Sequence, residues 1–128
     1  GHKGSMGTVH ANNPDDAMVR LEALAQSGDA KISEKALRQQ VTSAIDLIIQ
    51  VSRFSDGSRK VSHISEVRGC LPDGTYDVVP IFEILDMKRT PEGKLEGRVE
   101  ATGEIPSFMD EIVDNNLPFP RSKFNRAA

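Results

Sequence analysis

The chain has 128 residues, of which 38% are hydrophobic and 27% charged, and its formal net charge is −3. This length fits one domain, and the composition is typical of a globular chain rather than a disordered one. Lys and Arg are scattered along the sequence, which argues against a dedicated nucleic-acid-binding protein, because such proteins need a concentrated basic surface. No apolar run approaches the roughly 18 residues of a transmembrane helix. The single cysteine, Cys70, excludes an internal disulfide and is typical of a reducing cytoplasm.

The first third of the sequence predicts a short strand followed by two helices. Thr8 and Val9 favour extended backbone, so residues 6–10 are expected to form a strand. Asn13 and Pro14 are typical of a helix start, since Asn caps the first turn and Pro suits the first helical position. Helical spacing then predicts two buried faces. They consist of Met18, Leu21, Leu24 and Ala25 in the first helix, and of Leu37, Val41, Ala44 and Ile45 in a second helix that starts at Ser33.

The middle of the sequence predicts two β-hairpins. Leu47, Ile49 and Val51 alternate along a strand that ends near Phe54. A Ser-Asp-Gly-Ser turn follows, and residues 61–67 return as the partner strand. Residues 76–85 and 95–101 form the second pair of strands around a Thr-Pro-Glu-Gly turn.

The last part of the sequence predicts a short helix over residues 108–115, capped by Ser107, and a frayed basic tail. The expected order is therefore a short strand, two helices, two β-hairpins and a terminal helix, which is an α/β arrangement. One short strand offers too little sheet to cover two amphipathic helices, so we expect their missing packing partners to lie upstream of residue 1.

The segment with the most chemical content is residues 1–12, Gly-His-Lys-Gly-Ser-Met-Gly-Thr-Val-His-Ala-Asn. Glycine allows a ligand to approach the backbone closely, and His and Thr offer donors that suit phosphate oxygens. Spacing alone is weak support for such a site, because a polar, glycine-rich entry to a strand is more often structural.

The same segment resembles the histidine box of the ATPases of type II and type IV secretion systems, especially the CpaF-like branch of tight-adherence (Flp) pilus and conjugal transfer ATPases. That box reads Gly-His-x-Gly-Ser-x-x-Thr-x-His-Ala-Asn, and every fixed position is filled here. The resemblance continues over nearly the whole chain, through Arg-Leu-Glu at residues 20–22, Ala-Leu-Arg-Gln-Gln at 36–40, Asp-Gly-Ser-Arg at 56–59 and Ile-Ser-Glu-Val at 64–67.

The resemblance implies that residues 1–128 are the C-terminal part of a RecA-like P-loop NTPase domain. Residues 1–48 would carry the histidine box and the following helices, residues 49–103 the hairpins, and residues 104–128 the terminal helix and tail. The full-length protein would be a cytoplasmic hexamer, peripheral at the inner membrane, which uses ATP and Mg²⁺ for type II or type IV secretion or for pilus assembly. Its partners would be inner-membrane secretion or pilus platform proteins, and no nucleic acid is expected.

The resemblance also assigns candidate site residues. His2, Thr8 and His10 belong to the box near the γ-phosphate, where they would sense or polarise the nucleotide, and Asn12 closes the box. Other candidates for nucleotide binding or a subunit interface are Arg20, Glu22, Arg53 and Arg59. For Arg20 and Glu22, a structural ion pair that involves Glu22 is as well supported as a role in nucleotide binding. For Arg53 and Arg59, a solvent-exposed position in the hairpin is favoured over the alternative, in which the arginine stabilises the charge of the transition state in the neighbouring subunit.

This chain departs from the family in one important respect. It contains neither the Gly-x-x-x-x-Gly-Lys-[Ser/Thr] loop that binds phosphates nor an acidic Walker-B strand. We therefore expect the chain alone to be inactive and to need no cofactor, and we expect no metal site. A non-catalytic interaction or assembly module, derived from the C-terminal half of such an ATPase, is the alternative interpretation.

Overall fold

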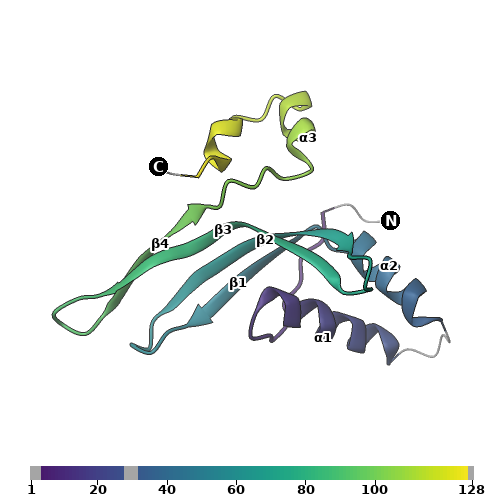
Figure 1. Ribbon diagram of the computed structural model, residues 1–128, viewed down its shortest axis with the longest axis horizontal. Helices are drawn as coiled ribbons and strands as arrows, with labels where there is room; N and C mark the ends of the chain where they lie inside the picture. Colours follow the sequence, from purple (N-terminus) through teal and green to yellow (C-terminus); the bar gives the residue numbers. More distant parts are fainter. Residues whose placement is uncertain (1–3, 28–31, 127–128) are drawn as a thin grey trace.

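The computed structural model describes residues 4–27 and 32–126 (Figure 1). Two helices come first, four strands follow, and two short helical segments end the chain. The elements are α1 (Pro14–Gln26), α2 (Glu34–Ala44), β1 (Leu47–Arg53), β2 (Arg59–Cys70), β3 (Tyr76–Arg89), β4 (Leu95–Ala101), α3 (Met109–Asp114) and the 3₁₀ helix η1 (Arg121–Phe124). Among the described residues, no helix is both long and apolar enough to cross a membrane.

The four strands form one antiparallel sheet in the order β1-β2-β3-β4. The two predicted hairpins are therefore confirmed, but β2 also pairs with β3, for example through Val67 and Val78. Contacts between the two hairpin turns strengthen this arrangement. Asp56 in the first turn accepts a hydrogen bond from the backbone amide of Leu95 at 2.7 Å, and Arg89 donates to the Ser55 hydroxyl at 3.1 Å.

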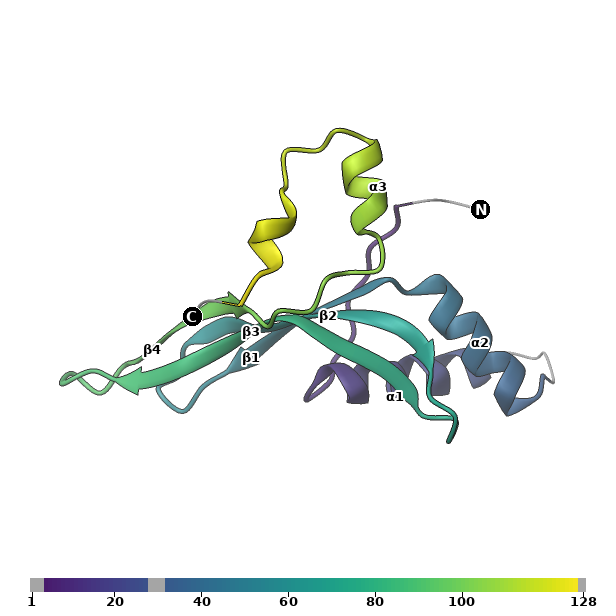
Figure 2. The same ribbon diagram turned by 45° about the horizontal axis from the view of Figure 1, so that its top comes forward.

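Helices α1 and α2 pack on one face of the sheet, where they build the first core around Met18, Leu37, Val41 and Val67 (Figure 2). The helices therefore find packing partners in this chain's own sheet, in contrast to our expectation that these would lie upstream. The predicted apolar face of α1 is partly wrong, because Leu24 is 63% exposed and Ala25 is also exposed. The buried positions of α1 instead include Ala17 and Glu22, so the helix is rotated toward the side that carries an ion pair with α2.

The opposite face of the sheet carries a C-terminal arm, residues 102–126, which rises from the end of β4 (Figure 2). Ile81 of the sheet, Met109 and Phe124 form a second core there. The prediction of a frayed tail is wrong, because Phe124 in η1 is only 4% exposed. The predicted cap is also wrong: α3 has no side-chain cap, because the Ser107 hydroxyl bonds Glu66 instead.

The strand predicted over residues 6–10 does not form. These residues are exposed and extended, but no strand in the described part of the chain pairs with them. An extended segment becomes a strand only when a neighbour satisfies its backbone groups. Within the described residues, the base of this segment is tied to the sheet by Gln50, whose side-chain amide donates to the carbonyl of Ala11 at 3.0 Å.

Candidate functional site

The candidate site begins where the extended N-terminal segment turns into α1. Asn13 caps the helix, and its side chain accepts a hydrogen bond from the Asp16 amide at 2.7 Å. The Asp16 carboxylate in turn accepts a hydrogen bond from the amide of Asn12 at 3.0 Å. These two hydrogen bonds satisfy the backbone amides of Asn12, just before the helix, and of Asp16, in its first turn. They fix the direction in which the preceding residues leave the helix.

Two of the predicted site residues line one hollow next to this helix. His10 and Arg20 line a shallow, open hollow of about 400 Å³ between the extended segment and one face of α1. Both side chains can donate hydrogen bonds, and their residues are exposed. The rest of the lining is mainly apolar or small: Val9, Ala23, Leu24 and Ser27. The hollow could therefore contact one end of an anion, but it does not enclose a ligand.

Arg20 and Glu22 belong to two separate ion pairs. Arg20 lies 3.1 Å from the Asp16 carboxylate, one helical turn earlier, whereas buried Glu22 lies 3.0 Å from Arg38 on α2. The hydrogen bond from the Asn12 amide, with the contribution of Arg20, lowers the pKa of Asp16. The hydrogen bond from Arg38 ties Glu22 to α2, so we assign Glu22 a structural role between the helices.

Tyr76 belongs to the same structural group as Glu22. Its hydroxyl is buried, and within the described structure it has no hydrogen-bond partner that meets normal geometry. Burial, together with the negative charge of Glu22, raises the pKa of Tyr76 to about 12. The phenol therefore stays protonated at neutral pH, and the Tyr76 side chain packs against the first core and does not line the candidate hollow.

The remaining predicted site residues are spread over the molecule. Thr8 is exposed on the extended segment and does not line the hollow, and His2 lies outside the described residues. Arg53 and Arg59 are partners across the end of the β1–β2 hairpin, and neither lines the hollow. Among the predicted residues that the structure describes, His10 and Arg20 are therefore the two that line a common hollow.

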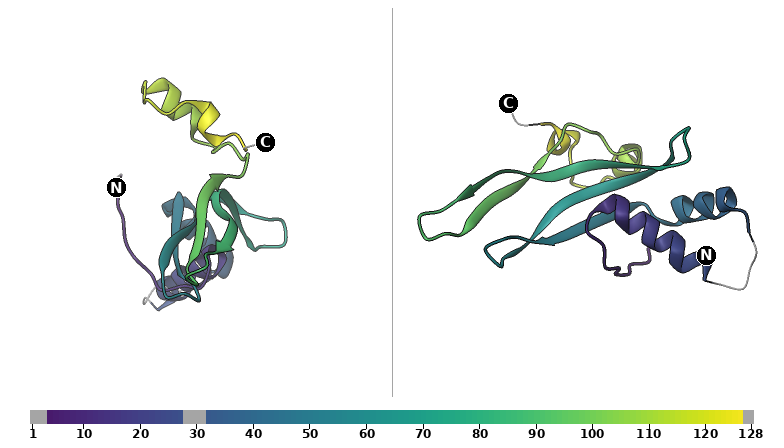
Figure 3. Two further views of the ribbon diagram at one scale, coloured as in Figure 1. Left: turned by 90° about the vertical axis from the view of Figure 1, so that its left-hand side faces the viewer. Right: turned by 60° about the horizontal axis from the view of Figure 1, so that its bottom comes forward.

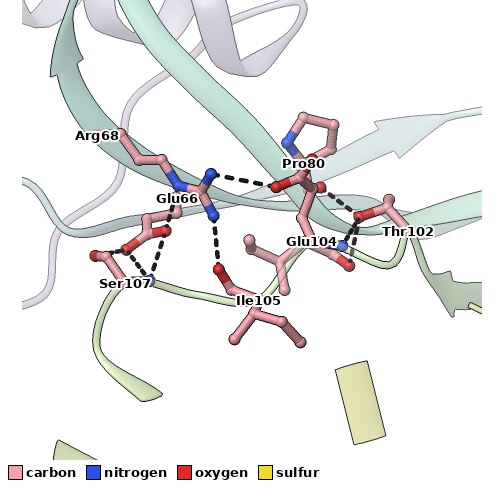
Figure 4. A network of polar contacts seen from close by, with 8 residues as sticks. Glu66, Arg68, Pro80, Thr102, Glu104, Ile105 and Ser107 are labelled. Atoms are coloured by element: carbon pink, nitrogen blue, oxygen red, sulfur yellow. Dashed lines mark hydrogen bonds and ion pairs between the residues drawn. The ribbon is translucent and has the colours of Figure 1, made fainter. Parts of the chain in front are cut away.

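A polar network between β2 and the arm was not predicted (Figure 4). Glu66 on β2 is 3% exposed and accepts hydrogen bonds from Arg68 at 2.8 Å and from both the amide and the hydroxyl of Ser107. Arg68 also donates to the carbonyl of Ile105 at 2.8 Å and pairs with Glu104 at 3.2 Å. This network ties the start of the arm to the sheet, and we call it the arm latch.

The chemistry available to the described residues is limited. They contain no group of three or more His, Cys, Asp or Glu side chains arranged to hold a metal ion. Cys70 is exposed at the end of β2. The hollow offers an imidazole and a guanidinium, which can bind and orient an anionic group or supply a proton donor. The hydroxyl in its lining, that of Ser27, donates a hydrogen bond to the Leu24 carbonyl at 2.6 Å.

Comparison with known proteins finds relatives over about half of the chain. A putative conjugal transfer protein of Mycobacterium tuberculosis is 38% identical over 68 residues, which are 53% of this chain and 19% of the relative. The conjugal transfer protein TrbB of Rhizobium radiobacter is 32% identical over 69 residues, 54% of this chain and 20% of the relative. A probable conjugal transfer protein TrbB of Sinorhizobium fredii is 31% identical over 78 residues, 61% of this chain and 22% of the relative.

The matched segments thus span about a fifth of the length of these curated relatives. No family model matches the chain. The comparisons therefore establish a likeness to conjugal transfer proteins.

Proposed function

We propose that this chain is the C-terminal portion of a conjugal transfer or secretion ATPase of the RecA-like type. The complete protein would be a homo-oligomer at the cytoplasmic side of the inner membrane and would couple ATP hydrolysis to a type IV or related secretion system or to pilus assembly. This chain would supply the histidine box, whose His10 and Arg20 would face the phosphate end of the nucleotide.

The observation that carries this proposal is the juxtaposition of His10 and Arg20 in one hollow. Both residues come from the segment that resembles the histidine box and its following helix, and both line the hollow beside α1. The likeness to proteins named for conjugal transfer supports the same class of machine. An exposed imidazole and guanidinium suit a group that approaches from another part of the protein.

The residues of this chain fit only part of what ATP and Mg²⁺ require. Mg²⁺ prefers oxygen ligands, and the described residues contain no acidic cluster that could hold it. The sequence also lacks the loop whose amides cradle phosphates. In the proposed role His10 and Arg20 therefore orient the phosphate end and stabilise its negative charge, while residues elsewhere in the complete protein bind the metal ion.

The proposal is tested by ATP hydrolysis of the complete protein that carries this chain. His10→Ala is expected to lower kcat by about 10²-fold, the usual range for a positioned proton donor or acceptor. Arg20→Gln is expected to lower kcat as well, because it removes a positive charge near the phosphates. Arg98→Gln is the matched control, since its side chain is 89% exposed and lies on β4 outside the hollow.

Two outcomes contradict the proposal, each in a different way. Unchanged hydrolysis in both the His10 and the Arg20 variants would exclude the hollow from the nucleotide site. A complete protein that neither binds nor hydrolyses ATP would favour the alternative, a non-catalytic module for interaction or assembly.

A further inference from the structure

Gln50 is a buried polar side chain in the middle of an edge strand. It lies on β1, is 8% exposed, and stands between Ile49 and Val51, which are both more than half exposed. By the two-residue period of a strand, Gln50 shares its face with Ile48, which packs against the first core. Burial of an amide on such a face has a cost unless the amide is hydrogen-bonded. The contact that this amide makes therefore indicates why a polar residue stands here.

That contact joins the sheet to the extended N-terminal segment, residues 4–12. The side-chain amide of Gln50 donates a hydrogen bond to the carbonyl oxygen of Ala11 at 3.0 Å. Figure 3 shows this segment passing the sheet before it turns into α1. The place of Ala11 therefore depends on a side chain that reaches out from β1.

A β-bulge holds the backbone of β1 at this position. Gln50 pairs with His63 across the sheet while Val51 pairs with Val61, so Ser62 is an extra residue on β2. Bulges change the direction in which side chains point. Here the hydroxyl of Ser62, which is 4% exposed, donates a hydrogen bond to the backbone carbonyl of Gln50 at 3.4 Å. The neighbouring strand thus supports the residue whose side chain reaches the N-terminal segment.

The carbonyl of Ala11 belongs to a peptide group that is held at both of its polar ends. The same planar unit contains the amide of Asn12, which donates a hydrogen bond to Oδ2 of Asp16 at 3.0 Å. That carboxylate oxygen also accepts a hydrogen bond from Nε of Arg20 at 3.1 Å. A continuous series of hydrogen bonds thus leads from Gln50, through this peptide group and the carboxylate, to Arg20.

His10 is attached directly to the residue that this peptide group fixes. Because peptide units are rigid, φ and ψ of Ala11 are the two soft dihedral angles between the fixed plane and the plane that contains the Cα atom of His10. The two residues that line the hollow are therefore connected to one peptide group, His10 through the chain and Arg20 through hydrogen bonds. A displacement of this group would change the distance between them.

We propose that Gln50 is a positioning residue for the segment that resembles the histidine box. By holding the peptide group between Ala11 and Asn12 against the sheet, it sets where His10 stands relative to Arg20. Gln50 does not line the hollow, so it acts through the backbone rather than on a ligand. The catalytic consequence rests on the proposed function, whereas the hold on the peptide group does not. A displacement of about 1 Å in a catalytic group can lower a rate by as much as about 10²-fold.

The hold on the peptide group is tested without nucleotide, by ¹⁵N relaxation of the chain. In the unmodified chain the amide of Asn12 should have an order parameter of about 0.85, as in rigid backbone, and Gln50→Met should lower it below about 0.6. Methionine has nearly the same length as glutamine and can pack beside Ile48, so urea denaturation should show that the variant is folded.

A second variant and a control accompany this measurement. Asp16→Ala removes the other hydrogen bond of the same peptide group and should lower the order parameter of Asn12 in the same way. Gln40→Met makes the same chemical change as Gln50→Met at an exposed position of α2. This control should leave the order parameter of Asn12 unchanged.

The catalytic consequence is tested by ATP hydrolysis of the complete protein, in a double-mutant cycle. Gln50→Met should lower kcat by about tenfold, because His10 is no longer held in place. In a protein that already carries His10→Ala, the same substitution should have no further effect, since the group that Gln50 positions is gone. A merely structural contribution would lower kcat by the same factor in both backgrounds. Gln40→Met should leave kcat unchanged.

This inference and the proposed function can fail separately. An unchanged order parameter of Asn12 in Gln50→Met would overturn the positioning role, and so would equal losses of kcat with and without His10. Either result leaves the proposed function standing, provided that His10→Ala itself lowers kcat. Hydrolysis that neither His10→Ala nor Arg20→Gln changes would contradict the proposed function and the catalytic consequence together. The order parameters would then still decide whether Gln50 holds the peptide group.

Discussion

The C-terminal arm and the N-terminal segment leave the body of the protein in opposite ways. The arm is anchored twice, by the buried carboxylate of Glu66 and by the apolar contacts of Met109 and Phe124. The N-terminal segment stays exposed from residue 4 to residue 10, and one hydrogen bond from Gln50 to Ala11 holds its base to the sheet. The fold thus specifies the position of the arm, whereas it leaves the side chain of His10 exposed and accessible to other molecules.

This difference separates residues that stabilise the protein from residues that are free to serve its function. A substitution in the arm latch should act through stability, because it disturbs buried groups. A substitution at His10 should act on function and leave stability unchanged. The following predictions test this distinction.

The largest effect is expected for Glu66→Ala. It removes the buried acceptor of three hydrogen bonds, one from Arg68 and two from the amide and hydroxyl of Ser107. Because a hydrogen bond to a charged group contributes about 1.5–3 kcal/mol, we expect the free energy of unfolding to fall by about 3–5 kcal/mol. Urea denaturation measures the loss, and limited proteolysis should cut the arm first. Glu100→Ala serves as control, because its contact with Arg98 is long, at 3.9 Å, and solvent-exposed. Equal stability of the two variants would contradict the anchoring role of Glu66.

Phe124→Ala should come next, with a loss of about 3 kcal/mol for a buried aromatic side chain. Its ring packs 5.7 Å from the ring of Phe82 and 5.1 Å from that of Phe119, so the substitution opens a cavity in the second core. Urea denaturation again provides the measurement. Leu117→Ala on the same arm is 55% exposed and should cost much less. A small effect of Phe124→Ala would mean that η1 is not held by its apolar contacts.

The dependence of stability on pH should reveal part of the Glu66 contribution. Burial raises the pKa of this carboxyl, but the hydrogen bonds from Ser107 and Arg68 outweigh burial and lower it below 4.5. Because the folded pKa lies below the unfolded one, the stabilisation is complete above about pH 4.5 and is lost as the pH falls through the folded pKa. Asp16 and Asp56 act in the same direction, so the comparison must be made with Glu66→Gln, whose stability should decrease less steeply in acid.

The smallest effect on stability is expected for His10→Ala. The side chain is exposed and contributes to neither core, so the melting temperature should change by less than about 2 °C. Calorimetry of the purified chain measures this value. A clear loss of stability would show that the N-terminal segment is part of the folded body, and any effect of this variant on ATP hydrolysis would then need another explanation.

Much of the fold could be predicted because its signals are local. Asn13 and Pro14 mark the start of α1, and the alternating residues from Leu47 onward mark the first strand of the sheet. The side of each element that is buried was harder to predict. Leu47, Ile49 and Val51 fit the strand pattern but face outward, and the buried position between them holds Gln50, which reaches the N-terminal segment. Tertiary contacts determine which face of β1 is buried, and the alternation of apolar residues along the sequence carries no information about those contacts.

The candidate site could be predicted only in part, for the same reason. The pairing of Arg20 with Asp16 is visible in the sequence as a four-residue helical spacing. The partner of Glu22, Arg38, is 16 positions away on another helix, and Ser107 is 41 positions from Glu66. No local pattern connects such residues. Ser107 matches the preferences of a helix cap, yet the buried carboxylate competes successfully for its hydroxyl.

The contacts between the two hairpin turns have a mechanical consequence. Asp56 and Leu95 join the turns by a bond between a carboxylate and a backbone amide, and Arg89 adds a second link to Ser55. Because the two hairpins are joined both by the pairing of β2 with β3 and by these bonds at their turns, they have less freedom to move relative to each other. Bonded contacts thus run from the β3–β4 turn to the β1–β2 turn, and β1 continues from there to Gln50, which holds the base of the segment that carries His10.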